Sequence, residues 1–137
     1  MKKAVTLLLA AIMIFAATAA MAADITVLVN GEKVEFDRQP ELQNGKVMIP
    51  FRFVAEKLGA TVAWEEETQT VFTSLNGSFA TLQIGNQSVF VDNKTFVSET
   101  APFIVVDRTL VSEEVLAQSL GAQVSWDEAA QTVTIIK

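Results

Sequence analysis

The sequence predicts a strand-rich α+β domain in which two β-hairpin/short-helix/β-hairpin repeats pack about a pseudo-twofold axis. Three observations predict this fold: an internal repeat at a spacing of 62 residues, Asn-Gly pairs between stretches of alternating apolar residues, and two short helical patterns that each end at a glycine. The chain has 137 residues, 50% of them hydrophobic, which is enough for one domain with its own core.

The repeat is clearest in the 27-residue window that begins at Val47, where ten residues are identical to those 62 positions later. The identical residues include Leu58-Gly59-Ala60, which matches Leu120-Gly121-Ala122, and Trp64, which matches Trp126. A match of this density predicts two copies of one supersecondary unit.

Upstream of this window the match is weaker. We align Ile25–Phe36 with Ala80–Val91 at a spacing of 55, as two short strands around a turn, and this alignment gives the second copy a longer connection through Ser98 to Asp107. The sequence therefore predicts repeats at about residues 25–75 and 80–136.

The first hairpin is predicted around Asn30-Gly31, because apolar residues alternate on both sides of this pair. The alternating residues are Ile25, Val27 and Val29 before the turn and Val34 and Phe36 after it. A short strand, Val47–Ile49, follows Asn44-Gly45.

A helix of about two turns is predicted to start at Pro50 and to end at Gly59, because proline is tolerated at a helix start and glycine favours a helix end. In the second copy Ser112 is the predicted N-cap and Gly121 the end. The predicted inner faces are Phe51, Val54, Ala55 and Leu58 in the first helix and Leu116, Ala117 and Leu120 in the second.

A hairpin with an acidic turn is predicted after each of the two helices. It runs from Val62 to Phe72 in the first copy and from Val124 to Ile136 in the second.

Composition excludes several classes of enzyme and metal site. The chain contains no His, Cys or Tyr, so imidazole bases, thiolate nucleophiles, thiolate or imidazole metal ligands and tyrosine-derived cofactors are ruled out. Two acidic turns, Glu65-Glu66-Glu67 and Asp127-Glu128, could hold calcium if backbone carbonyls converged with their carboxylates. The sequence has no Asp-x-Asp-x-Asp-Gly loop, so solvated acidic turns are the simpler interpretation. Carboxylate pairs and a lysine Schiff base remain as catalytic options, but nothing in the spacing of the acids points to a glycosidase. We expect no enzyme activity, no cofactor and no metal.

The N-terminus resembles a secretory signal. Lys2 and Lys3 precede an apolar run from Ala4 to Ala20, and Ala20-Met21-Ala22 has the small residues of a cleavage site. We expect residues 1–22 to be removed, which leaves a single domain of residues 23–137 that is secreted or held at the cell surface. An uncleaved membrane anchor is the alternative, because the run just reaches the length of a spanning helix.

The mature chain is acidic. Residues 23–137 carry 8 basic and 16 acidic side chains, a net charge of −8. Such a surface repels phosphate backbones, so nucleic acid is not an expected partner. Apart from the apolar run near the N-terminus, no segment is apolar enough to span a membrane.

The run from Gly45 to Trp64, GKVMIPFRFVAEKLGATVAW, resembles the signature of the copper amine oxidase-like N-terminal domain, or stalk domain, family. Val29–Val34 resembles that family's leading hairpin, and Leu120–Asp127 resembles its second repeat. The resemblance implies a bacterial, secreted or surface-attached module without catalysis. In the second copy the proline and arginine of the pattern are replaced by Ser112 and Glu114, so only Pro50–Arg52 could carry a site that depends on that element.

Three residues are candidate ligand or partner contacts. Arg52 could present its guanidinium fork to a carboxylate or phosphate, although an internal ion pair with an acid of a neighbouring strand is the simpler interpretation. Trp64 and Trp126 could stack on sugars, although their shared repeat position favours a core role.

The sequence thus predicts a non-catalytic module that binds or organises envelope components, with cell-wall polymer or a surface protein as partner. The alternative is a structural subunit that self-associates through sheet edges, with the terminal strand at Thr132–Lys137 as the exposed edge.

Overall fold

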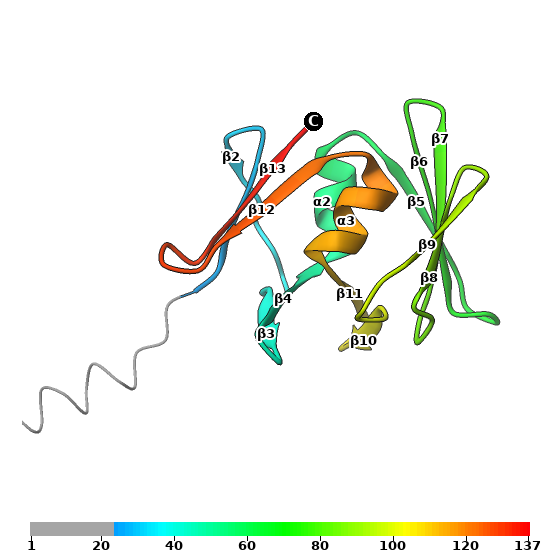
Figure 1. Ribbon diagram of the computed structural model, residues 1–137, viewed down its shortest axis with the longest axis horizontal. Coiled ribbons are helices and arrows are strands. Elements are labelled where there is room, and N and C mark those ends of the chain that lie inside the picture. The colour runs from blue at the N-terminus through cyan, green and yellow to red at the C-terminus, as the bar shows by residue number, and fades with distance from the viewer. Residues whose placement is uncertain (1–23) are drawn as a thin grey trace, which may run out of the picture.

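The computed structural model describes residues 24–137, which form three small sheets around two short helices (Figure 1). Figure 1 shows α2 and α3 in the middle, between two sheets that we call A and C. Sheet A has the order β12-β13-β1-β2, sheet B the order β10-β11-β4-β3, and sheet C the order β5-β6-β7-β8-β9. The strand-rich α+β class is thereby confirmed, whereas the signal segment lies outside the described residues.

The strands of sheet A are β1 (Thr26–Val29), β2 (Glu32–Lys33), β12 (Gln123–Asp127) and β13 (Thr132–Ile136). Sheet B contains β3 (Glu41–Gln43), β4 (Lys46–Pro50), β10 (Phe103–Val105) and β11 (Arg108–Ser112). Sheet C contains β5 (Thr61–Glu65), β6 (Thr70–Leu75), β7 (Ser78–Gln83), β8 (Ser88–Val91) and β9 (Lys94–Val97). The helices are α2 (Phe51–Lys57) and α3 (Glu113–Leu120).

The element bounds recur at 62 residues along the whole chain, including the upstream hairpin. The first strand, β1, starts at Thr26 and its counterpart β8 at Ser88, so the expected spacing of 55 for this hairpin is wrong. The connection through Ser98 to Asp107 is no longer than its counterpart in the first copy. The extra residues instead form β7, which has no counterpart in the other copy and shifts the apparent alignment.

The two copies meet in the middle of sheet B. Strands β4 and β11 pair antiparallel, with Ile49 opposite Val111, its counterpart 62 residues later. A local twofold axis between these two residues would produce this register. The pseudo-twofold relation between the complete halves stays a prediction.

The outer sheets mix strands from both copies. In sheet A, β1 of the first copy pairs in parallel with β13 of the second. In sheet C, β7 joins β6 of the first copy to β8 of the second. The expectation that the terminal strand is an exposed edge is wrong, because β13 lies between β12 and β1.

The helices follow the predicted caps and pack into the core. Ser112 Oγ accepts a hydrogen bond from the backbone N–H of Val115 at 3.3 Å, and Gly121 ends α3 in the left-handed conformation at φ 63°. The predicted inner face of α3 is wrong at Ala117, which is only half-buried. Ser119 is buried instead because its hydroxyl bonds to the carbonyl of Val115, which satisfies the polar group inside the helix.

No helix formed by residues 24–137 is long and apolar enough to cross a membrane.

Candidate functional site

A groove at the start of α2 brings together two of the three residues predicted from the sequence. We call it the Arg52–Trp64 groove. It has a volume of about 360 Å³ and is lined by both of these side chains and by residues of β4, β6, β10 and β11. The residues that give it chemical character are Arg52, Phe53, Trp64, Glu66, Asp107 and Arg108.

Arg52 reaches this groove from the second position of α2. Its Nη1 lies 3.2 Å from the carbonyl oxygen of Val62 on β5 and 3.4 Å from Oε2 of Glu56, one turn along the same helix. The expected ion pair with an acid of a neighbouring strand is therefore wrong, because the acid comes from α2 itself. These bonds orient the guanidinium while its side chain stays 46% exposed, so it has donors left for a ligand.

Trp64 points inward from β5 because side chains alternate along the strand. It is half-buried and packs against the core, and its indole N–H donates to Glu66 Oε2 at 2.6 Å. It is thus a core-edge residue that also lines the groove. The two interpretations that the sequence left open for Trp64, core residue and aromatic platform, are compatible with this position.

The opposite wall carries a second arginine that sequence reasoning missed. Arg108 at the start of β11 makes two hydrogen bonds to the carboxylate of Asp37, and its guanidinium carbon lies 5.7 Å from the centre of the Phe53 ring. Phe53 in turn packs edge-to-face on Phe36, with ring centres 5.6 Å apart. The hydrogen bond from Arg108 holds the pKa of Asp37 below its ordinary value, so the pair stays ionised at neutral pH.

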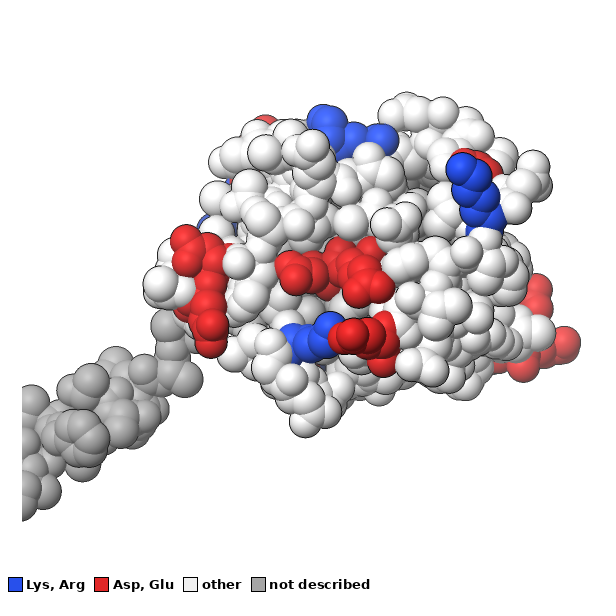
Figure 2. All heavy atoms as spheres, viewed as in Figure 1, with Lys and Arg blue, Asp and Glu red and all other residues white. Residues whose placement is uncertain are grey.

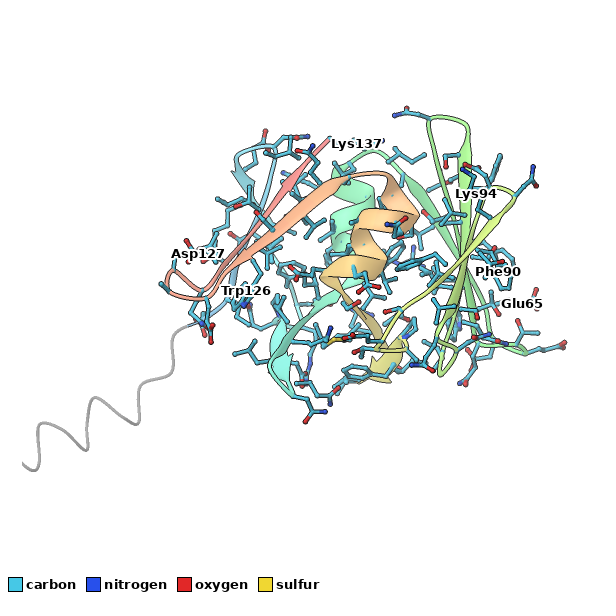
Figure 3. The ribbon with its side chains drawn as sticks, viewed as in Figure 1. Glu65, Phe90, Lys94, Trp126, Asp127 and Lys137 are labelled. Carbon is cyan, nitrogen blue, oxygen red and sulfur yellow. The ribbon has the colours of Figure 1, made fainter. Side chains whose placement is uncertain are left out.

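Trp126 lies away from this groove, although it occupies the repeat position of Trp64. It lines a separate, open hollow on the β12–β13 hairpin with Ser125, Asp127, Glu128 and Ala129. Figure 3 shows it beside Asp127 at the far end of the molecule from sheet C. No arginine lines this hollow, and Glu114 stands where the first copy has Arg52.

Acidic side chains are spread over the surface rather than gathered at one point. Figure 2 shows them over the middle of one face and near its two ends, with fewer basic side chains. Within residues 24–137 no three acidic side chains converge as metal ligands would. Glu65 and Asp127 accept hydrogen bonds within their turns, from Thr68 and Ala130, as turn residues do.

Glu113, at the first position of α3, is an exception among the acidic side chains. Its Oε2 is buried without a hydrogen-bond partner, and burial raises the pKa of this carboxyl above its ordinary value.

The Arg52–Trp64 groove has the lining of a ligand-binding site. Arg52 has donors left for a carboxylate or phosphate, whereas the fork of Arg108 is already paired with Asp37. Trp64 and Phe53 provide apolar surface for a ring or an apolar side chain. Arg108 had no signal in the sequence, because it reaches the groove only through the pairing of β4 with β11.

A family model described as "Copper amine oxidase N-terminal domain" matches residues 28–135. No curated protein and no solved structure is similar enough to match the chain.

Proposed function

The chain belongs to the copper amine oxidase N-terminal domain family, and from that premise we propose that it is an extracellular or cell-surface module that binds a cell-envelope component. The family domain is a non-catalytic accessory domain of copper amine oxidases. We propose that this chain is likewise non-catalytic and works without a cofactor or metal.

The observation that carries the proposal is the meeting of Arg52, Trp64 and Arg108 in one groove. Arg108 is paired with Asp37, so Arg52 is the cation that remains for a ligand. A guanidinium beside aromatic surface suits a ligand with an acidic group next to a ring or an apolar group. Wall polymers with carboxylate-bearing sugars or peptides have this chemistry, and so does an acidic segment of a surface protein. The secretory signal expected at residues 1–22 would bring the module to such partners.

The test is co-sedimentation of the mature protein, residues 23–137, with purified wall sacculi. Arg52→Ala should reduce the bound fraction, and Arg52→Lys should restore it only partly because lysine lacks the planar fork. Trp64→Ala should also reduce binding. Trp126→Ala is the matched control, since it removes the same side chain at the equivalent position outside the groove. Equal loss in both tryptophan variants would contradict the assignment of the groove.

Self-association through sheet edges is the second candidate function. The observation that favours it is β9, the outermost strand of sheet C, where Val97 is exposed. Size-exclusion chromatography over a concentration series separates the two functions, because a wall-binding monomer elutes at one volume throughout.

A further inference from the structure

The outer face of sheet C carries a row of aromatic and hydroxyl side chains. Phe72 on β6 lies opposite Thr81 on β7, and Thr81 lies opposite Phe90 on β8. Phe72 is 43% and Phe90 47% exposed. Figure 3 shows Phe90 on the side of sheet C that faces away from the helices. Because two strand spacings separate the two phenylalanines, their backbone positions lie about 10 Å apart.

A shallow groove runs along this row, with a volume of about 310 Å³. We call it the Phe72–Phe90 groove. Thr81 lies between the two rings, and Gln83, Asn86 and Glu65 are among its polar residues. It lies on the opposite face of β5 and β6 from Trp64 and Val71, which line the Arg52–Trp64 groove.

The fold itself does not require these rings. At the equivalent positions of sheet A, Thr134 replaces Phe72 and Leu28 replaces Phe90. The strand that supplies Thr81 and Gln83, β7, has no counterpart in the other copy. The row of aromatic and hydroxyl side chains therefore occurs in sheet C alone, where the extra strand β7 widens the sheet.

The polar part of the groove is held in place before any ligand arrives. Gln83 Nε2 donates to the carbonyl of Thr68 at 3.0 Å, and Asn86 Nδ2 donates to Gln83 Oε1 at 3.1 Å. Asn86 Oδ1 accepts from the backbone N–H of Ser88 at 2.8 Å. Fixed side chains lose less entropy on binding, so such a surface favours a ligand that needs oriented hydrogen bonds.

The charge of the groove selects an uncharged ligand. Glu65 is its single ionisable lining residue, on a mature chain of net charge −8, so an anion finds no partner here. A cation finds one carboxylate, which already accepts from Thr68. Most lining residues carry hydroxyl or amide groups, unlike the apolar centre of a stable protein dimer.

We propose that the Phe72–Phe90 groove binds an uncharged β-1,4-linked glycan chain. The two rings stack on the C–H faces of sugars, and Thr81, Gln83 and Asn86 bond to their hydroxyl groups. The spacing of the two backbone positions corresponds to about one disaccharide unit, so alternate sugars of an extended chain can present the same face to both rings. This site is independent of the Arg52–Trp64 groove and goes beyond the function proposed for it.

The test is isothermal titration of residues 23–137 with cellohexaose and with chitohexaose, which share the linkage and differ in the N-acetyl group. The variants Phe72→Thr and Phe90→Leu introduce the residues that the other copy carries. Each should weaken binding by at least about tenfold, because a stacking surface is lost or reduced. Thermal midpoints establish that the variants are folded.

Two controls make the result specific to this groove. Phe79→Ser removes a 63% exposed ring on the same sheet face but outside the groove, and it should leave binding unchanged. Arg52→Ala should also leave oligosaccharide binding unchanged while it reduces sacculus binding, so the two proposals fail separately.

Four results would overturn the proposal. Neither oligosaccharide binds the unmodified protein, or Phe72→Thr and Phe90→Leu bind as tightly as it does, or Phe79→Ser weakens binding as much as they do. A concentration-dependent dimer that Phe72→Thr abolishes would also overturn it, because the face would then be an interface between copies of this chain.

Discussion

Replacing Val106 by asparagine is expected to stabilise the domain. Val106 and Asp107 form the two-residue turn between β10 and β11, with φ angles of 46° and 63°. A β-branched residue is rare in the left-handed region, because its Cβ substituents crowd the backbone. In the first copy the same turn is Asn44-Gly45, at φ 52° and 80°, and its residues suit this conformation.

The magnitude follows from the strain and from the exposure of the side chain. A non-glycine residue in the left-handed region costs about 1–2 kcal/mol, and asparagine recovers much of this cost. Val106 is 77% exposed, so its removal loses little burial. We expect a gain of about 1 kcal/mol, or about 4 °C in Tm for a domain of this size. Asp107 is kept because aspartate tolerates the left-handed region better than a β-branched residue does.

The assay is urea unfolding followed by circular dichroism, with the slope m checked for constancy. The reciprocal variant Asn44→Val should lower the free energy of unfolding by a similar amount. Val97→Asn is the control, since it makes the same replacement at an exposed strand position. An unchanged or lower midpoint for Val106→Asn would refute the assignment of strain to this turn.

Three further predictions follow from packing, charge and topology. Trp64→Ala and Trp126→Ala should each cost about 2–3 kcal/mol in urea unfolding, less than a fully buried tryptophan, because both are half-buried; a cost below about 0.5 kcal/mol would contradict their packing role. Burial raises the folded-state pKa of Glu113 above its unfolded value, so its contribution to stability falls as pH rises through this interval. The urea midpoint of Glu113→Gln should therefore rise relative to that of the unmodified protein as the pH is raised from about 4 to about 7. A difference between the two midpoints that does not change with pH would contradict this prediction. Residues 23–77 and 78–137, expressed separately, should give poorly dispersed amide spectra that disperse on mixing, because sheet A needs strands from both; a cooperative thermal transition of either half alone would contradict this.

Local features of the fold were predictable from the sequence because each has a local physical cause. Asn30-Gly31 adopts the two positive φ angles that a tight hairpin needs, and Ser112 caps α3 as expected. The parallel pairing of β1 with β13 and the position of β7 were not predicted. These pairings join strands far apart in the chain, and the apolar alternation of each strand is compatible with several neighbours.

The candidate site was predictable to a similar extent. Arg52 and Trp64 could be named because one lies in the first turn of a helix and the other near the end of an alternating strand, and this strand follows the helix closely. Arg108 could not be named, because it enters through the contact between the two copies. The row from Phe72 to Phe90 was also missed, because exposed phenylalanines in an alternating strand do not reveal which side of the sheet faces solvent.

The repeat separates the residues that serve the fold from those that are free to serve a ligand. Trp64 and Trp126 are identical and half-buried in both copies, so packing is the role that they share. Packing does not require arginine at position 52. Glu114 occupies the equivalent position in α3, and a helix and a hairpin form there in the same order. A positive charge at this position is therefore unnecessary for the fold. Its presence beside Trp64 is one difference between the Arg52–Trp64 groove and the hollow at Trp126. The preference of the groove for an acidic ligand should depend on that guanidinium, while the ring adds apolar contact.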